Sequence, residues 1–240
     1  MVPAIVAGAC GGGASSVDDR EGTRASSRTE APIAVARPPS AARGRIVVLG
    51  DSLTAGLGLG PEQSFPVLLQ RKIDSQGLPY EVVNAGVSGD TSAGGLRRLD
   101  WVLEGDVRIL ILALGGNDGL RGLPAEALEA NLAAIIERCR AADVDVLLAG
   151  MEAPPNLGAE YTLAFRRVYS RLAEAYDLPL VPFLLAGVAG VPRFNQPDGI
   201  HPNVEGTRMV ADLIWEALLP MLLDEEAKGS HQPAAHPAGS

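Results

Sequence analysis

One histidine of the chain stands in a segment that can hold it in place. His231 and His236 fall in a tail rich in Ala, Pro and Gly, whereas His201 lies in the turn-rich stretch QPDGIHP. Imidazole is the side chain best suited to proton transfer near neutral pH. Asp198, three residues earlier, is the right kind of group to orient an imidazole and stabilise its cation. The stretch therefore predicts a proton-transfer site, and a solvated loop histidine is the alternative.

Ser52 is the second candidate for chemistry. It follows the apolar run VVLG, in the string VVLGDSLTAG. A serine there could cap a helix, but the next helical pattern begins only after Gly60 and Pro61, so its cap would lie nearer Gly60. A phosphate-binding loop would need the G-x-G-x-x-G or G-x-x-x-x-G-K-[ST] order, and neither is present. A tight turn that presents Ser52 at the edge of a sheet fits better.

Alternating strand and helix patterns supply the elements that would position these residues. Short aliphatic runs predict strands at 45–49, 80–84, 107–114, 144–150 and 178–182, and longer periodic stretches predict helices at 61–76, 91–104, 124–142, 160–176 and 204–223. Nearly continuous apolar strands between helices indicate a parallel sheet covered on both faces. The fold class is therefore α/β, a three-layer α/β/α arrangement with a mainly parallel five-stranded sheet. Ligands of such sheets bind beyond the carboxyl ends of the strands, where four polar or glycine-rich loops should meet.

Composition limits the domain organisation and the partners. In 240 residues, 47% of them hydrophobic, we expect one folded domain at 45–223, a leader at 1–44 and a disordered tail at 224–240. The net charge of −9 and the absence of a basic cluster argue against nucleic acid as a partner. With one positioned histidine and no paired-cysteine spacing, we expect neither a metal nor another cofactor.

The two cysteines carry separate expectations. Residues 1–10, MVPAIVAGAC, resemble the end of a bacterial lipoprotein signal, in which Cys10 would receive a lipid; the alternative is a stray cysteine in a disordered start. A lipidated or exported chain would reside in the cell envelope, in the periplasm or outside the cell, and otherwise in the cytoplasm. Cys139 lies in a helical pattern, where a lone cysteine is a small hydrophobe, and we expect no disulfide to Cys10. Apart from the tether we expect a monomer.

Four short motifs together resemble the SGNH/GDSL hydrolase superfamily. They are GDSL at 50–53, the glycine of VSGD at 87–90, GGND at 115–118 and DGIHPN at 198–203. The longer strings NAGVSGDTS and LGGNDGL resemble the branch that contains bacterial acyl-CoA thioesterase I, lysophospholipase and arylesterases. The resemblance implies a flavodoxin-like SGNH hydrolase fold. It also implies hydrolysis of aryl esters, short-to-medium acyl esters, acyl thioesters or lysophospholipids.

The resemblance also implies roles for five residues. Ser52 would be the nucleophile, His201 the general base and then acid, and Asp198 the group that orients His201. The backbone N–H groups of Ser52 and Gly89, with the side-chain amide of Asn117, would form the oxyanion hole. These types suit the chemistry, because a serine hydroxyl needs a base to take its proton and glycine allows close backbone approach.

Several alternatives stay open at this stage. Gly89 and Asn117 could serve turn geometry alone, since both residue types favour left-handed backbone. Asp51 and Asp90 are acids near the crevice, but an acid beside the nucleophile should point away from the histidine, so both are left out of the catalytic set. A carbohydrate acetyl esterase, or a non-catalytic lipid- or glycan-binding protein, are the alternative functions.

Overall fold

The computed structural model describes residues 44–230. Cys10, His231 and His236 lie outside this range, as do nearly all of the expected leader and the end of the expected tail. What was inferred for them from the sequence therefore stays a prediction.

A five-stranded sheet forms the centre of the fold. Its strands are β1 (Gly44–Gly50), β2 (Tyr80–Gly86), β3 (Val107–Ala113), β4 (Asp145–Ala149) and β5 (Leu180–Val181). The order is β2-β1-β3-β4-β5, and every neighbouring pair is parallel. Residues of the central strands, such as Val48 and Ile111, are fully buried because helices cover both faces. The predicted five-stranded parallel sheet is confirmed.

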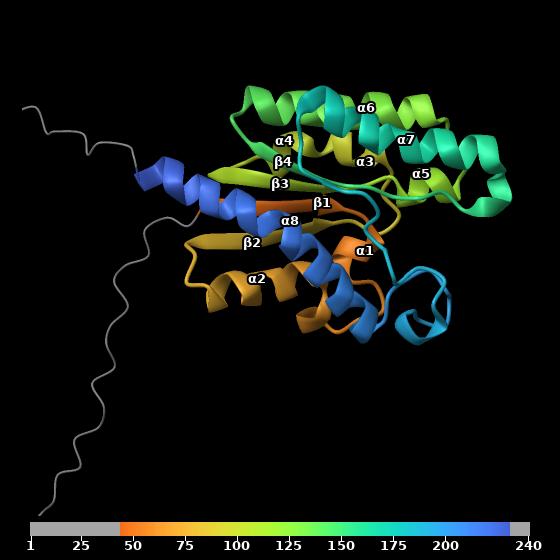
Figure 1. Cartoon of the computed structure of the whole chain (residues 1–240), viewed down its shortest axis with the longest axis horizontal. Helices are drawn as coiled ribbons and strands as arrows, with labels where there is room; N and C mark the ends of the chain where they lie inside the picture. Colours follow the sequence, from red (N-terminus) through yellow and green to blue (C-terminus); the bar gives the residue numbers. More distant parts are fainter. Residues whose placement is uncertain (1–43, 231–240) are drawn as a thin grey trace, which may run out of the picture. The chain divides into compact units, whose positions relative to one another are not determined.

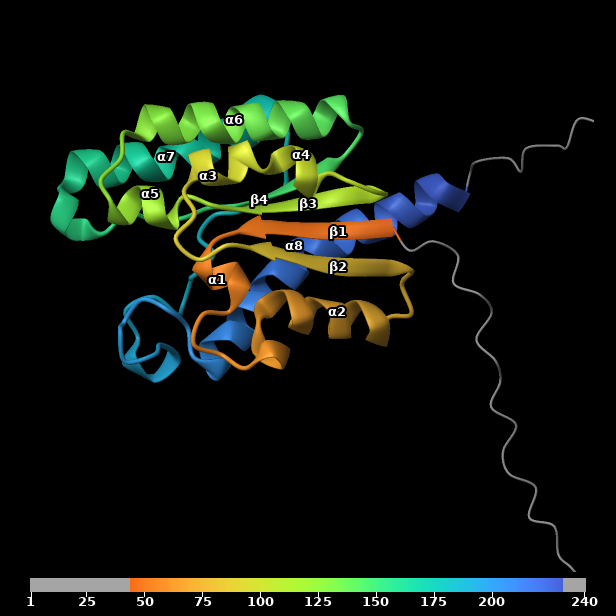
Figure 2. The same cartoon turned by 180° about the vertical axis from the view of Figure 1, so that it is seen from behind.

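Helices form the two outer layers (Figures 1 and 2). Helices α2 (Phe65–Ser75) and α8 (Val204–Ser230) cover one face of the sheet. Helices α3 (Ser92–Arg97), α4 (Leu99–Val102), α6 (Ala125–Ala141) and α7 (Ala159–Tyr176) cover the other. The apolar stripe of α6 explains its placement, since Leu128, Leu132, Ile135 and Cys139 recur at helical spacing and are all buried. Within residues 44–230, no helix is long and apolar enough to span a bilayer.

Three expected helices differ in extent from the structure. The stretch 61–76 is a short 3-10 helix, η1 (Pro61–Gln63), followed by α2, and the stretch 91–104 is divided into α3 and α4 at Arg98. Helix α8 continues to Ser230, past the end expected at 223. Glutamate and alanine are good helix formers, and extending an existing helix avoids the cost of a new nucleus. Part of the expected disordered tail is therefore helical.

Two short helices at the carboxyl edge of the sheet were not expected. Helix α1 (Ser52–Ala55) follows β1 directly, and α5 (Gly116–Leu120) follows β3. A side chain at Gly86 would overlap the Ala55 backbone nitrogen, so this glycine lets α1 lie against the end of β2. Gly56, with φ of 77°, ends α1 in the left-handed conformation. Two further 3-10 turns, η2 (Pro155–Leu157) and η3 (Pro192–Phe194), lie in the loops that follow β4 and β5.

Candidate active site

The sheet register brings three loops to one level. Gly50, the last residue of β1, is the register partner of Gly86 in β2 and of Ala113 in β3. Ser52 begins α1 just beyond Gly50, Gly89 lies in the loop after β2, and Asn117 lies in α5 after β3. All three line one cavity. The expected meeting of these loops at the carboxyl edge is therefore observed.

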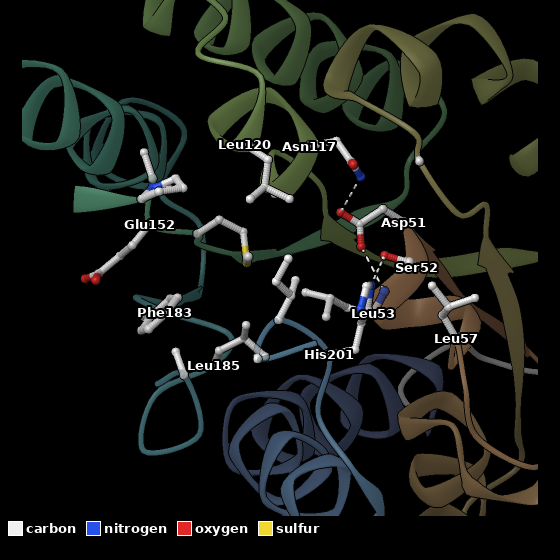
Figure 3. A pocket seen from close by; sticks show the side chains of 18 of the residues that line it. Asp51, Ser52, Leu53, Leu57, Asn117, Leu120, Glu152, Phe183, Leu185 and His201 are labelled. Atoms are coloured by element: carbon white, nitrogen blue, oxygen red, sulfur yellow. Dashed lines mark hydrogen bonds between the residues drawn. The ribbon is translucent and has the colours of Figure 1, made fainter. Parts of the chain in front are cut away.

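Ser52, His201 and Asp198 form a continuous chain of hydrogen bonds (Figure 3 shows the serine and the histidine). His201 Nε2 lies 2.9 Å from Ser52 Oγ, and His201 Nδ1 lies 2.6 Å from Asp198 Oδ2. A carboxylate only accepts hydrogen bonds, so Nδ1 carries a hydrogen and, in the neutral imidazole, Nε2 accepts from the serine hydroxyl. This tautomer leaves Nε2 ready to take the serine proton.

Asp198 is held in its charged form by its own turn. Its Oδ1 accepts the backbone N–H groups of Ile200 and His201, each at 3.0 Å. These bonds, followed by the bond from the His201 ring, lower the pKa of Asp198 to about 2. Gly199, with φ of 71°, supplies the left-handed residue that the turn requires. The acid therefore remains a carboxylate wherever the histidine can act as a base.

Helix α5 contacts the loop after β2; Asn117 belongs to the helix and Gly89 to the loop. Asn117 Nδ2 donates to the Asp90 carbonyl oxygen at 2.9 Å and lies 3.3 Å from Asp51 Oδ2. Gly89 has φ of 84°, so a turn requirement explains its residue type as well as an oxyanion role does. Asn117 lies inside a helix with right-handed backbone, so turn geometry does not explain its amide.

The acids left out of the catalytic set prove to have contacts in this region. Asp51, and not Ser52, is the N-cap of α1, because its Oδ1 accepts the Leu53 N–H at 3.0 Å. It is 2% exposed and lies at the wall of the cavity, and its burial raises its pKa to about 6. Asp90 forms an ion pair with Arg98 at 2.7 Å. Sequence reasoning named Asp51 as an acid near the crevice but missed its capping role, because α1 is too short to show helical periodicity.

The glycine run at 56–60 contacts the loop that carries His201. Gln196 Nε2 donates to the Leu57 carbonyl at 2.7 Å and to the Pro202 carbonyl at 3.0 Å. A side chain at Gly58 would overlap the Gln196 amide. The run therefore packs against the histidine loop, and Leu57 adds to the cavity wall.

The cavity beside Ser52 has a volume of ≈ 630 Å³ and is mainly apolar. In Figure 3, Leu120, Phe183 and Leu185 lie between the serine end and Glu152 at the far end. Apart from Asp51 and His201, Glu152 is the one acidic or basic side chain among the lining residues. Among residues 44–230, no group of three or more His, Cys, Asp or Glu side chains is arranged to hold a metal ion.

Comparison with known proteins identifies the family. Residues 48–209 match the GDSL-like lipase/acylhydrolase family. The chain belongs to this family, as the four motifs predicted, and it is a GDSL-type carboxylic ester hydrolase.

Named relatives cover most of the folded part. The chain is 45% identical over 183 residues to the esterase TesA of Pseudomonas aeruginosa, covering 76% of this chain and 91% of that one. It is 39% identical over 184 residues to thioesterase 1/protease 1/lysophospholipase L1 of Escherichia coli K12, covering 76% and 87%. Among solved structures, the esterase EstA of Pseudoalteromonas sp., inhibited by monoethylphosphonate, aligns with a TM-score of 0.71 at 34% identity, covering 75% of this chain and 98% of that one.

The raised pKa of Asp51 predicts a change of stability with pH. The folded state holds the Asp51 proton up to about pH 6, whereas an unfolded chain releases it near the ordinary value of 3.8. The stabilising contribution is thus fully present below pH 3.8 and is lost as pH rises through 6. The 2.2-unit difference (6 − 3.8) corresponds to about 3 kcal/mol. As pH rises from 4 to 7, wild type should lose up to this amount of unfolding free energy relative to Asp51→Asn, whose side chain does not titrate. Urea unfolding of both proteins across this range measures the change. Parallel profiles would contradict the assignment.

Proposed function

We propose that the enzyme cleaves carboxylic esters through an acyl-enzyme on Ser52, with His201 and Asp198 as its proton-transfer pair. The hydrogen-bond chain from Ser52 through His201 to Asp198 is the observation that carries this proposal. A hydroxyl is a weak nucleophile until a positioned base accepts its proton, and this chain supplies that base and its orienting acid.

The proposed reaction proceeds in two halves. In the first, Ser52 Oγ attacks the ester carbonyl while His201 Nε2 takes the hydroxyl proton; the tetrahedral intermediate then collapses as His201 returns the proton to the leaving alcohol. In the second, His201 takes a proton from water, which attacks the acyl-serine, and the acid is released as Ser52 recovers its proton. Asp198 stabilises the imidazolium in both halves.

Three donors would stabilise the negative charge on the substrate oxygen. They are the backbone N–H groups of Ser52 and Gly89 and the Asn117 side-chain amide, all at the cavity wall. Fixed donors directed at developing charge need no reorganisation during the reaction, and one such donor contributes about 3 kcal/mol in other hydrolases. These assignments are part of the proposal.

The apolar cavity supports acyl chains and aryl groups as the preferred substrates. Leu53, Leu120, Phe183, Leu185 and Ile200 line it, and apolar surface there would leave sugar hydroxyls without partners. Aryl and short-to-medium acyl esters fit this lining better than acetylated carbohydrates. Acyl thioesters and lysophospholipids are included because one relative is named for both activities.

The first prediction of this proposal concerns the catalytic groups. Ser52→Ala and His201→Ala should each lower kcat for p-nitrophenyl butyrate at least about 10⁴-fold, and the double variant should be no worse than either alone, because the two groups act as one unit. Asn117→Ala should lower kcat about 10²- to 10³-fold with a smaller effect on KM. Steady-state kinetics at pH 8 would measure all four.

A covalent probe provides the control for those variants. A fluorophosphonate should label wild type at Ser52, located by peptide mass spectrometry, and should leave Ser52→Ala unlabelled. Substituting Ser88, another serine that lines the cavity, should leave labelling intact. Full esterase activity in Ser52→Ala, or labelling at a different serine, would overturn the assignment of the nucleophile.

The second prediction concerns the acyl chain. Each methylene buried in the cavity contributes about 0.8 kcal/mol, so kcat/KM should rise by up to about fourfold per methylene from acetate until the chain fills the cavity. Leu120→Ser should flatten this rise, because Leu120 lines the cavity. Leu223→Ser is the matched control, since both leucines are about half exposed and Leu223 lies elsewhere, in α8. A preference for acetylated xylose over the longer esters would favour the carbohydrate esterase.

The third prediction concerns Cys10, the proposed site of lipid attachment. It rests on the resemblance of residues 1–10 to the end of a lipoprotein signal. A lipid there would tether an otherwise monomeric enzyme to the cell envelope. The protein isolated from its native cells should then begin at Cys10, carry acyl mass on that residue and partition with membranes, and Cys10→Ser should abolish all three. An unmodified start at Met1 would favour a cytoplasmic enzyme.

A further inference from the structure

Asp51 is a buried acid that forms no ion pair within residues 44–230, although the charge of a protonated His201 acts on it through space. It is 2% exposed, and none of the ion pairs found within residues 44–230 includes it. Burying a carboxylate is unfavourable, and the raised pKa of Asp51 reflects this. Its role as N-cap of α1 does not require a charge, because asparagine and serine cap helices equally well. Another requirement must explain an acid at this position.

The second oxygen of Asp51 faces Asn117, as Figure 3 shows. The Asn117 amide nitrogen has two hydrogens, and two acceptors lie around it. The Asp90 carbonyl oxygen lies at a normal distance of 2.9 Å, and Asp51 Oδ2 lies at a long distance of 3.3 Å. The backbone carbonyl can only accept, and so can Asp51 once its carboxyl is ionised. Together they orient the Asn117 side chain so that its amide nitrogen, rather than its oxygen, faces Asp51 and the Asp90 carbonyl.

The local backbone is built for this approach. Gly116 precedes Asn117, and a side chain there would come within 3.0 Å of Asp51 Oδ2. The other oxygen of Asp51 is fixed by the Leu53 N–H, so the carboxylate cannot turn away without losing the cap. The long contact to Asn117 is the weak one of the pair, so its hydrogen is the one that a substrate oxygen can take over.

We propose that Asp51 is a positioning residue that holds the Asn117 amide with its nitrogen toward the oxyanion formed at Ser52. This inference rests on the proposed oxyanion role of Asn117. As charge builds on the substrate oxygen, the second amide hydrogen moves from the long contact with Asp51 to the oxyanion, while the bond to Asp90 keeps the amide in place. An amide at position 51 could donate as well as accept, so it would permit the flipped orientation of Asn117.

Asp51→Asn is the primary test, because it keeps the helix cap and removes the acceptor-only group. At pH 8, where Asp51 is ionised, kcat for p-nitrophenyl butyrate should fall roughly 10- to 100-fold, with KM within about threefold of wild type. This loss is smaller than the roughly 10²- to 10³-fold loss expected when an oxyanion-hole donor is removed altogether. Asp51→Ser, which also caps, should behave in the same way and provides a second variant. Full kcat in either folded variant would overturn the proposal.

A double-mutant cycle separates positioning from a general structural effect. If Asp51 acts through Asn117, Asp51→Asn should lower kcat less than about twofold in the Asn117→Ala background. The same 10- to 100-fold loss in both backgrounds would overturn the proposal. Unchanged kcat in Asn117→Ala alone would also overturn it, together with the oxyanion role of that residue. The nucleophile assignment would still stand or fall separately, on the labelling of Ser52.

Discussion

At the carboxyl end of the sheet, Gly50 of β1 pairs in register with both Gly86 of β2 and Ala113 of β3. The segments that carry Ser52, Gly89 and Asn117 all start from this row. A slip of one residue in either pairing would move a loop by about 3.3 Å and turn its strand's apolar side chains to the wrong face. The buried strands exclude such a slip, so the packing that stabilises the sheet also fixes the spacing of the three loops. The geometry of the site is in this sense a consequence of the core.

Hydrogen bonds from helix α5 hold the loops at this spacing. Side chains from this helix and its C-terminal end contact the loop after β2 and the start of α3. Asn117 donates to the Asp90 carbonyl, Asp118 accepts from Ser92, and Arg121 donates to the Gly89 carbonyl at 2.9 Å. Asp118 is itself buried and satisfied by these bonds. Donors held in this way are preorganised, which is what stabilisation of a transient charge requires.

The elements that could be predicted from the sequence are those with long, periodic apolar patterns. Helices α2, α6 and α7 carry such patterns, strands β1, β3 and β4 carry buried apolar runs, and the four motifs pointed to the loops between them. Helices α1 and α5 span four and five residues, which is too short for a period to show. The position of Asp51 could not be predicted for the same reason: without α1, an acid before the serine has no defined direction. The end of α8 was missed because its last residues lack an apolar stripe, although their helix propensity is high.

The loop that bears His201 lies outside the register that fixes the other site residues. It is 149 positions from Ser52 in the chain, and it reaches the serine from beyond the last strand. One amide bridges the two segments: Gln196 donates to the Leu57 carbonyl beside the nucleophile and to the Pro202 carbonyl next to the histidine. Gly58 leaves room for that amide, with φ of 77°. The glycine run after the GDSL motif therefore belongs to the alignment of Ser52 with His201. It gives the loop that bears His201 a fixed surface to pack against, which the sheet itself cannot provide.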